Sequence, residues 1–309
     1  MRLDNEKNKR YNDKAIFLIH IFHKETFHMN FSHMFDENEK PLDSFPADGG
    51  FVGIFRTIAC IGDSLSSGEF EGTGAEGQRT YHDMFDFSWG QYLARMAGTT
   101  VYNFSRGGMT AEEYMKTFAK EKGFFDPSLA ASAYIVALGV NDMSRVIDGR
   151  TTFGDLSDID FSDGTKNKPT FAGYYAAVLQ AYRAIRPDAF FFLMTMPSTA
   201  FVKDTGRDVL FDRHRDFLYA LAKRLPRTYV LDFRTYAPPY AGDFERHFYL
   251  GGHMNPMGYM LTARMTVSYI DYIIRHNTDD FAQVGFIGTP YRNTDGSGCF
   301  RPAEQGENK

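Results

Sequence analysis

Four short polar stretches in this sequence carry the residue types that acyl transfer requires. A serine supplies a hydroxyl nucleophile, a histidine supplies an imidazole base, and a glycine N–H with an asparagine amide can stabilise an oxyanion. The stretches are Gly62-Asp63-Ser64, Asn103 to Gly108, Gly139-Val140-Asn141-Asp142 and His253-Met254-Asn255. Brought together, they would form a site that transfers an acyl group to and from a serine.

The first stretch directly follows an apolar run. Residues 57–61 read Thr-Ile-Ala-Cys-Ile, which predicts a buried strand that ends at Gly62. Open α/β sheets bind their ligands at the carboxyl ends of the strands, so a polar turn at this point is a candidate site. Taken alone it is weak evidence, because Gly, Asp and Ser are also common turn residues. The other three stretches give it weight.

Short apolar runs alternate with helical periodicity from Gly53 onward, which predicts parallel βαβ units. Central strands covered on both faces are nearly continuous apolar runs, and 133–138 (Ala-Tyr-Ile-Val-Ala-Leu) fits this. We expect strands at 57–61, 100–104, 133–138, 190–194 and 229–233, and helices at 89–97, 110–123, 171–185, 209–225 and 255–276. The prediction is a flavodoxin-like three-layer αβα sandwich with a five-stranded, mostly parallel sheet, in which the four polar stretches meet at one edge.

The order and spacing of these stretches resemble the SGNH (GDSL-type) hydrolase family over residues 53 to about 275. By this resemblance Ser64 corresponds to the nucleophile and His253 to the general base. The oxyanion hole corresponds to the N–H groups of Ser64 and Gly108 and the side chain of Asn141. The Gly-x-Ser-x-Gly motif of other α/β-hydrolases is absent, which agrees with a nucleophile near the start of the fold.

One position departs from the family pattern. The family usually has an aspartate three residues before the histidine, and this chain has Leu250 there. A histidine can still act as a base when a main-chain carbonyl or water fixes its tautomer, so we expect a Ser64–His253 dyad. Asp243 and Glu245, on the preceding loop, are the carboxylates that could substitute for the missing acid.

Several polar residues near these stretches have simpler interpretations. Asp63 is expected mainly to bond its own turn, and Asn255 to cap the last helix while it holds the histidine loop. Arg106 is interpreted as a surface or ion-paired arginine rather than a substrate contact. The last group comprises histidines that we interpret as surface or packing residues: His82, His214 and His247.

The predicted function is hydrolysis of a small acyl ester through an acyl-enzyme, with an O-acetylated carbohydrate as the preferred substrate class. A lysophospholipase or thioesterase would use the same residues, so these remain alternatives. Because of Leu250, a binding protein that has kept the fold and lost efficient catalysis is a further alternative. No cofactor is expected.

Composition excludes other functions. With net charge −5 and pI near 6.0 there is no basic surface for nucleic acid, and no segment approaches the roughly 20 apolar residues of a membrane helix. Cys60 and Cys299 lie in very different settings, which argues against a disulfide and for a cytoplasmic protein. The sequence leaves open whether the chain forms a homo-oligomer.

Three regions are expected along the chain. Residues 1–50 form an extension, read as a strand or hairpin packed on the main domain, 51–276 form the hydrolase domain, and 277–309 form a polar surface tail. The extension contains four histidines without a cysteine or a carboxylate pair at a zinc-like spacing, so no metal site is predicted there. They are His20, His23, His28 and His33.

Overall fold

A computed structural model of the 309-residue chain describes residues 34, 36–199 and 207–291. Residues 40–309 group into one compact unit, which contains all four polar stretches. Residues 1–39 form a separate unit. The strand or hairpin predicted in the extension falls mostly outside the described residues, as do its four histidines and Cys299.

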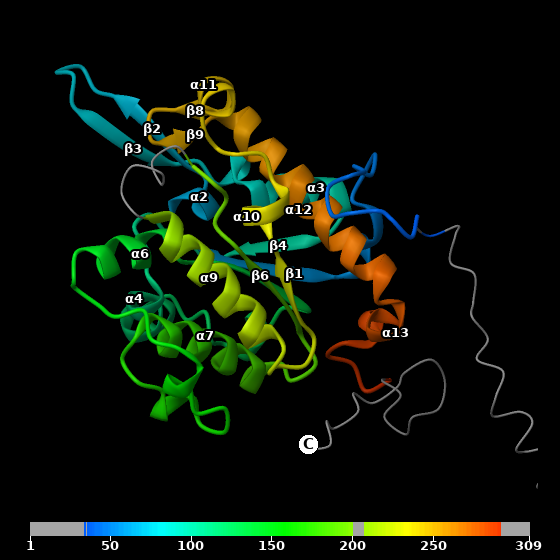
Figure 1. Cartoon of the computed structure of the whole chain (residues 1–309). Coiled ribbons are helices and arrows are strands. Elements are labelled where there is room, and N and C mark those ends of the chain that lie inside the picture. The colour runs from blue at the N-terminus through cyan, green and yellow to red at the C-terminus, as the bar shows by residue number, and fades with distance from the viewer. Residues whose placement is uncertain (1–33, 35, 200–206, 292–309) are drawn as a thin grey trace, which may run out of the picture. The chain divides into compact units, whose positions relative to one another are not determined.

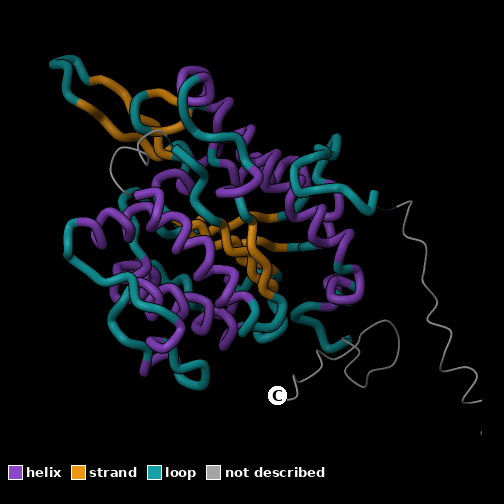
Figure 2. Tube along the Cα trace, viewed as in Figure 1, coloured by secondary structure: helices purple, strands orange, loops and turns teal. Residues whose placement is uncertain are grey.

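The centre of the compact unit is a five-stranded sheet in which every described strand pairing is parallel. Its order, β4-β1-β5-β6-β7, places β1 between two neighbours (Figure 2). The predicted strands are therefore confirmed, with small differences in their ends. Their bounds are β1 (Thr57–Gly62), β4 (Thr100–Asn103), β5 (Ala133–Ala137), β6 (Phe190–Met194) and β7 (Thr228–Leu231).

Helices cover both faces of this sheet, which makes the three layers of the predicted sandwich (Figure 1). Successive residues of β1 point to opposite faces: Ala59 and Ile61 pack with one buried cluster, Ile58 and Cys60 with the other. The first cluster includes side chains of α4 (Ala111–Glu113), η3 (Tyr114–Phe118), α5 (Ala119–Glu121), α7 (Phe171–Ile185) and α9 (Arg207–Ala222). The second includes side chains of α3 (Trp89–Ala97) and α12 (Pro256–His276).

Helix starts lie where the sequence predicts them, because polar side chains cap the free N–H groups. Ser88, Thr110, Thr170 and Asn255 each accept a hydrogen bond from a main-chain N–H in the first turn of the following helix. The helix expected at 110–123 is less regular than predicted, since its middle turn, η3, is π-helical. Shorter helices complete the framework: α6 (Val140–Ile147), α10 (Phe233–Tyr236), α11 (Asp243–Phe248), η2 (Phe85–Phe87), η4 (Pro127–Leu129), η5 (Leu156–Asp158) and η6 (Gly164–Lys166).

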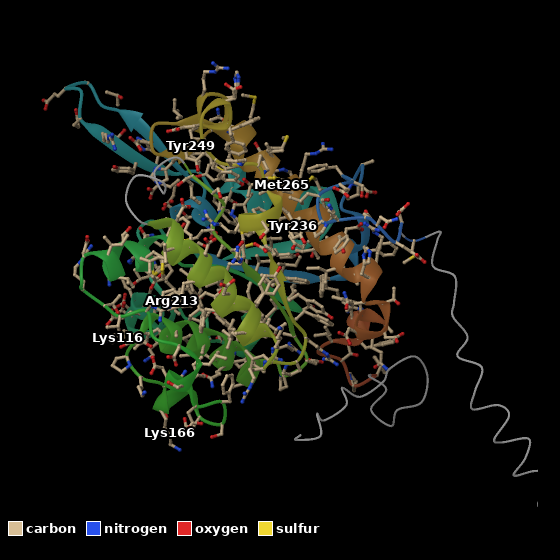
Figure 3. The ribbon with its side chains drawn as sticks, in the orientation of Figure 1. Lys116, Lys166, Arg213, Tyr236, Tyr249 and Met265 are labelled. Carbon is tan, nitrogen blue, oxygen red and sulfur yellow. The ribbon has the colours of Figure 1, made fainter. Side chains whose placement is uncertain are left out.

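The polar stretch at 66–87, predicted as a loop bordering the site, instead contains an antiparallel hairpin. Its strands are β2 (Glu69–Thr73) and β3 (Arg79–Asp83), and the hairpin extends beyond the helical layers at upper left in Figure 1. A two-residue pair, β8 (Tyr249–Leu250) with β9 (His253–Met254), lies beside β2. Tyr249, labelled in Figure 3, marks this pair.

Both ends of the described unit pack more closely on the domain than the sequence indicated. The Phe51 N–H, in the helical turn η1 (Gly50–Ile54), donates to Asp271 Oδ1 on α12 at 2.7 Å. At the other end, α13 (Thr278–Phe281) and η7 (Val284–Phe286) follow α12, and Phe281 stacks on Phe190 of β6 with ring centroids 4.5 Å apart. A tail expected to be surface chain thus contributes an aromatic ring to the core.

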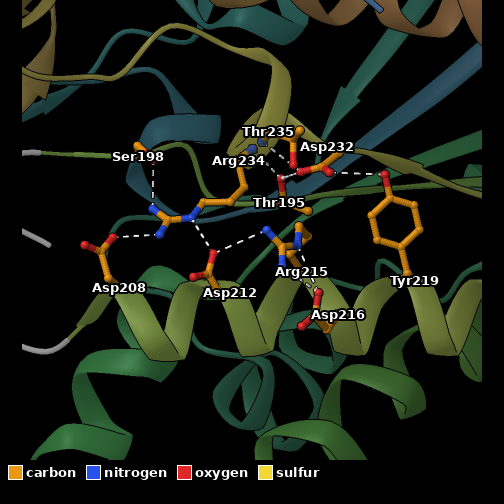
Figure 4. A network of polar contacts seen from close by, with 10 residues as sticks. All are labelled: Thr195, Ser198, Asp208, Asp212, Arg215, Asp216, Tyr219, Asp232, Arg234 and Thr235. Atoms are coloured by element: carbon orange, nitrogen blue, oxygen red, sulfur yellow. Dashed lines mark hydrogen bonds and ion pairs between the residues drawn. The ribbon is translucent and has the colours of Figure 1, made fainter. Parts of the chain in front are cut away.

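A polar network holds the segment after β6 against α9 and α10 (Figure 4). The Arg234 guanidinium contacts Asp208 at 2.6 Å and Asp212 at 3.0 Å, both on α9. Its third contact is Ser198 Oγ at 2.9 Å. The Arg234 N–H donates to Thr195 Oγ1 at 2.8 Å, so one residue fixes the segment that leaves the sheet edge.

Candidate active site

Ser64, the predicted nucleophile, is the first residue of the short helix α2 (Ser64–Ser67) at the carboxyl end of β1. Asp63 is its N-cap, and Asp63 Oδ1 accepts a hydrogen bond from the Leu65 N–H at 3.1 Å. The turn role predicted for Asp63 is therefore present in the structure. Burial raises the pKa of this carboxyl to about 7, since a charge there would have little contact with water.

Asn141 connects the strand ends that carry the other predicted oxyanion groups. Its Nδ2 donates to the Met109 carbonyl at 3.1 Å and lies 3.4 Å from Asp63 Oδ2. Met109 follows Gly108, and Asp63 precedes Ser64. The amide is thus held between the two stretches that would supply N–H donors to an oxyanion.

Gly108 requires its residue type, because its φ of 71° lies in the left-handed region that favours glycine. The turn it belongs to is tied back to β1 and β4: Ser105 Oγ donates to the Cys60 carbonyl at 3.0 Å. Next to Asn141, Asp142 Oδ1 accepts a hydrogen bond from the Ala111 N–H at 3.0 Å. This bond fixes the asparagine loop against the start of α4.

His253, the predicted base, begins β9 immediately before α12. Asn255 holds this segment in both directions: its Oδ1 accepts from the Gly258 N–H at 3.0 Å, and its Nδ2 donates to the His247 carbonyl at 2.8 Å. Contacts between α2 and β9 bring the serine turn and the histidine strand together. The cap predicted for Asn255 is present, and it positions the histidine as well.

Two glutamates of β2 flank the His253 ring. Glu71 Oε2 lies 3.4 Å from Nδ1, and Glu69 Oε1 lies 3.2 Å from Nε2. All three side chains are largely buried, with exposed fractions of 15% for His253, 16% for Glu69 and 7% for Glu71. The ring therefore lies between two carboxyl groups two residues apart on one strand, which project to the same face.

Glu71 has the properties of an orienting carboxylate. Its Oε2 accepts a hydrogen bond from the Gly252 N–H at 2.7 Å, and its Oε1 pairs with Arg79 Nε at 3.1 Å. The Gly252 hydrogen bond is the main cause that lowers the pKa of Glu71, and His253 and Arg79 add to it. Glu71 is thus held ionised beside Nδ1.

This geometry corrects the expectation that His253 Nδ1 would meet only a main-chain carbonyl or water. It also differs from the proposed substitutes: Asp243 pairs with Arg246 at 2.9 Å on the surface, and within the described residues neither it nor Glu245 contacts His253. Leu250, at the position of the family's aspartate, is exposed. The carboxylate comes instead from β2, which follows the serine turn.

Sequence reasoning missed both glutamates because 66–87 was interpreted as a loop. The signal that could have found them is the alternation Glu69-Phe70-Glu71, in which a buried phenylalanine separates two acids. Such a period of two predicts a strand with both acids on one face. The pattern could not indicate that this face would meet His253, which is 182 residues from Glu71.

The remaining predicted residues lie outside this cluster. Arg106 forms an ion pair with Glu113, as its surface interpretation expects. His82 and His247 are exposed, whereas His214 is fully buried between helices, where burial lowers its pKa to about 4. Tyr81 of β3 was not singled out by the sequence, yet its ring meets the edge of His253 at a centroid distance of 5.8 Å and is 53% exposed.

A mostly apolar cavity of about 70 Å³ lies beside the Ser64 turn. Its walls come from the turn itself, from the segment after β6 and from α12. The lining residues are Asp63, Leu65, Ser66, Trp89, Ala137, Val140, Met194, Thr195, Met196, Pro197, Phe233, Tyr240, Met254 and Thr262. The Arg234 network thus supports one wall of this cavity.

Two classes of feature are missing from the described residues. No group of three or more His, Cys, Asp or Glu side chains within 34, 36–199 and 207–291 could hold a metal ion. Over the same residues, no helix has the length and apolarity needed to cross a membrane.

Comparison with known proteins agrees with this geometry. The family model described as the GDSL-like lipase/acylhydrolase family matches residues 60–261, which include all four polar stretches. The chain belongs to this family and is a carboxylic ester hydrolase. No curated protein matched.

Solved structures share the fold. A protein from Lactobacillus plantarum aligns at TM-score 0.50 and 17% identity over 71% of this chain and 97% of its own. A family two carbohydrate esterase from Clostridium thermocellum, solved with cellohexaose, aligns at 0.49 and 17% over 73% of this chain and 65% of its own. A Corynascus carbohydrate esterase of the same family aligns at 0.49 and 18% over 76% and 69%. At these identities the likeness describes the fold alone.

Proposed function

We propose that this enzyme hydrolyses short acyl esters of carbohydrates, with Ser64 as the nucleophile and His253 as the general base. The observation that carries the proposal is the ionised Glu71 beside His253 Nδ1, in a cluster that also brings β9 against the Ser64 turn. A carboxylate at Nδ1 keeps the proton on that nitrogen and leaves Nε2 to accept the proton of serine. It also stabilises the imidazolium that forms.

The reaction follows in two stages. Ser64 Oγ attacks the ester carbonyl carbon as its proton passes to His253 Nε2, and the tetrahedral intermediate collapses as that proton passes to the leaving alcohol. Water then attacks the acyl-enzyme by the same route. The N–H groups of Ser64 and Gly108 and the amide of Asn141 would stabilise the negative oxygen in both stages.

The cavity beside the serine turn supports a short acyl group. One water needs roughly 10–15 Å³ on this measure of volume, so a cavity of about 70 Å³ holds only a few heavy atoms. A fatty acyl chain would not fit there. An acetyl group or a slightly longer acyl group would.

An exposed aromatic ring supports a sugar as the alcohol half. Tyr81 lies at the edge of His253 and is 53% exposed, on the side of the ring where the leaving alcohol takes its proton. Tyrosine combines a large apolar face with a polar tip, which suits contact with a sugar ring. We place the carbohydrate against this hairpin.

A covalent probe tests the nucleophile. A fluorophosphonate should label Ser64 alone, and Ser64→Ala should lose both the label and several orders of magnitude in kcat on an acetylated sugar, with unchanged thermal unfolding. Ser67→Ala is the matched control, because Ser67 lies on the same short helix and its hydroxyl bonds Asp83. Stoichiometric labelling at another residue would reject the assignment. Absence of any label would favour a binding protein, and faster turnover of long acyl esters a lysophospholipase or thioesterase.

A further inference from the structure

Glu69 occupies the ring nitrogen that the proposed reaction needs. Its Oε1 lies 3.2 Å from His253 Nε2, the atom that must accept the proton of Ser64. Glu71 meanwhile faces Nδ1. Both contacts can be hydrogen bonds at once only when the imidazole carries a proton on each nitrogen, and a doubly protonated ring is not a base. This arrangement therefore describes a resting state.

The second oxygen of Glu69 points across the site. A Cβ built on Gly107 would lie 2.2 Å from Glu69 Oε2, so this oxygen rests against the loop that carries Gly108. The carboxyl group thus spans the space between the base and the predicted oxyanion loop. An ester bound for attack must place its leaving oxygen near Nε2, which is where the Glu69 carboxyl group now lies.

The position of Glu69 is held by its neighbours. Tyr259 Oη donates to the Glu69 carbonyl at 2.6 Å, and this fixes the start of β2. Burial is the main cause that raises the pKa of Glu69, and the charges of Asp83 and Glu71 add to it, whereas His253 lowers it. A carboxylate in these surroundings needs a hydrogen-bond donor at all times.

We propose that Glu69 is a specificity-determining residue that selects esters whose alcohol carries a hydroxyl group next to the ester. When His253 Nε2 turns to Ser64, Glu69 loses its donor, and a substrate hydroxyl replaces it. An alcohol without a donor leaves the carboxylate unpaired and is disfavoured, since a site built to bond a hydroxyl rejects an analogue that lacks it. The inference rests on the proposed Ser64–His253 reaction.

The test compares two small esters that differ only in this donor, 2-hydroxyethyl acetate and 2-methoxyethyl acetate. The measured quantity is the ratio of their kcat/KM values. We expect the wild-type enzyme to prefer the hydroxy ester by at least about 10-fold. In Glu69→Ala the ratio should fall to about 1, and kcat/KM for the methoxy ester should rise because Nε2 is free.

Asp83→Asn is the matched control, because it removes a nearby negative charge without touching His253, and it should keep the wild-type ratio. Glu69→Gln preserves the shape and should lower the ratio, which guards against an alanine variant that folds poorly. A wild-type ratio near 1, or a ratio unchanged in both Glu69 variants, would overturn the inference. If neither ester is turned over and Ser64 is not labelled by a fluorophosphonate, the proposed function itself fails.

Discussion

At the residue scale, the position of Glu71 explains how the chain does without an aspartate at position 250. Glu71 is held by the Gly252 N–H and by Arg79, and its lowered pKa keeps it ionised at any pH where a histidine can act as a base. Its hydrogen bond to the residue just before His253 also fixes the loop. One carboxylate therefore sets both the charge and the position of the imidazole.

The prediction for this residue is a loss of kcat in Glu71→Gln by about 100- to 10,000-fold, since a neutral amide no longer stabilises the imidazolium and can favour the wrong tautomer. Steady-state kinetics on an acetylated sugar measure it. Asp243→Asn is the control, because Asp243 pairs only with Arg246 on the surface, and it should change kcat less than twofold. The opposite pattern, with Asp243 essential and Glu71 silent, would return the acid to α11.

At the element scale, the sequence predicted regular elements well and long-range contacts poorly. The five strands and the helix caps at Ser88 and Asn255 follow from local patterns, which need no knowledge of distant residues. The β2–β3 hairpin was missed because its short strands are rich in polar and glycine residues, and polar composition resembles a loop. Phe281 was missed because one turn of helix has no period to read.

An element-scale prediction concerns Arg234, whose side chain is only 8% exposed and bonds two aspartates of α9. Arg234→Leu should lower the free energy of unfolding by about 1–3 kcal/mol, because it removes charge-assisted hydrogen bonds while the half-exposed aspartates can turn to water. Denaturant unfolding measures this. Arg215→Leu, on α9 itself, breaks a contact with the 67% exposed Asp216 and should cost less than about 1 kcal/mol. Equal costs for the two variants would contradict the role given to the network.

At the scale of the whole molecule, parallel topology brings four distant stretches to one edge of the sheet, and it buries carboxyl groups there. Burial raises the pKa of Asp63 and of Asp142 to about 7, against about 3.9 for an aspartate in an unfolded chain. Between these values the folded protein binds protons that the unfolded chain has released. The free energy of unfolding therefore falls as pH rises through this range.

A buried histidine acts in the opposite direction below this window. The pKa of His214 is lowered to about 4 by burial, against about 6.5 in the unfolded chain, so His214 costs stability as pH falls below about 6.5. Above pH 6.5 this effect is nearly complete. The range from pH 6.5 to 8 therefore isolates the aspartates, and each should cost about 1 kcal/mol across it.

We accordingly expect the melting temperature to be a few degrees lower at pH 8 than at pH 6.5. Asp142→Asn should remove about half of that difference, because its amide oxygen can still accept the Ala111 N–H and cannot ionise. Asp216→Asn, a change to an exposed carboxyl on α9, should leave the difference intact. Thermal unfolding of the three proteins at both pH values decides the matter. A pH dependence that Asp142→Asn leaves unchanged would mean that this carboxyl is already ionised at pH 6.5, held by the nearby Arg145 and main-chain N–H groups rather than neutralised by burial.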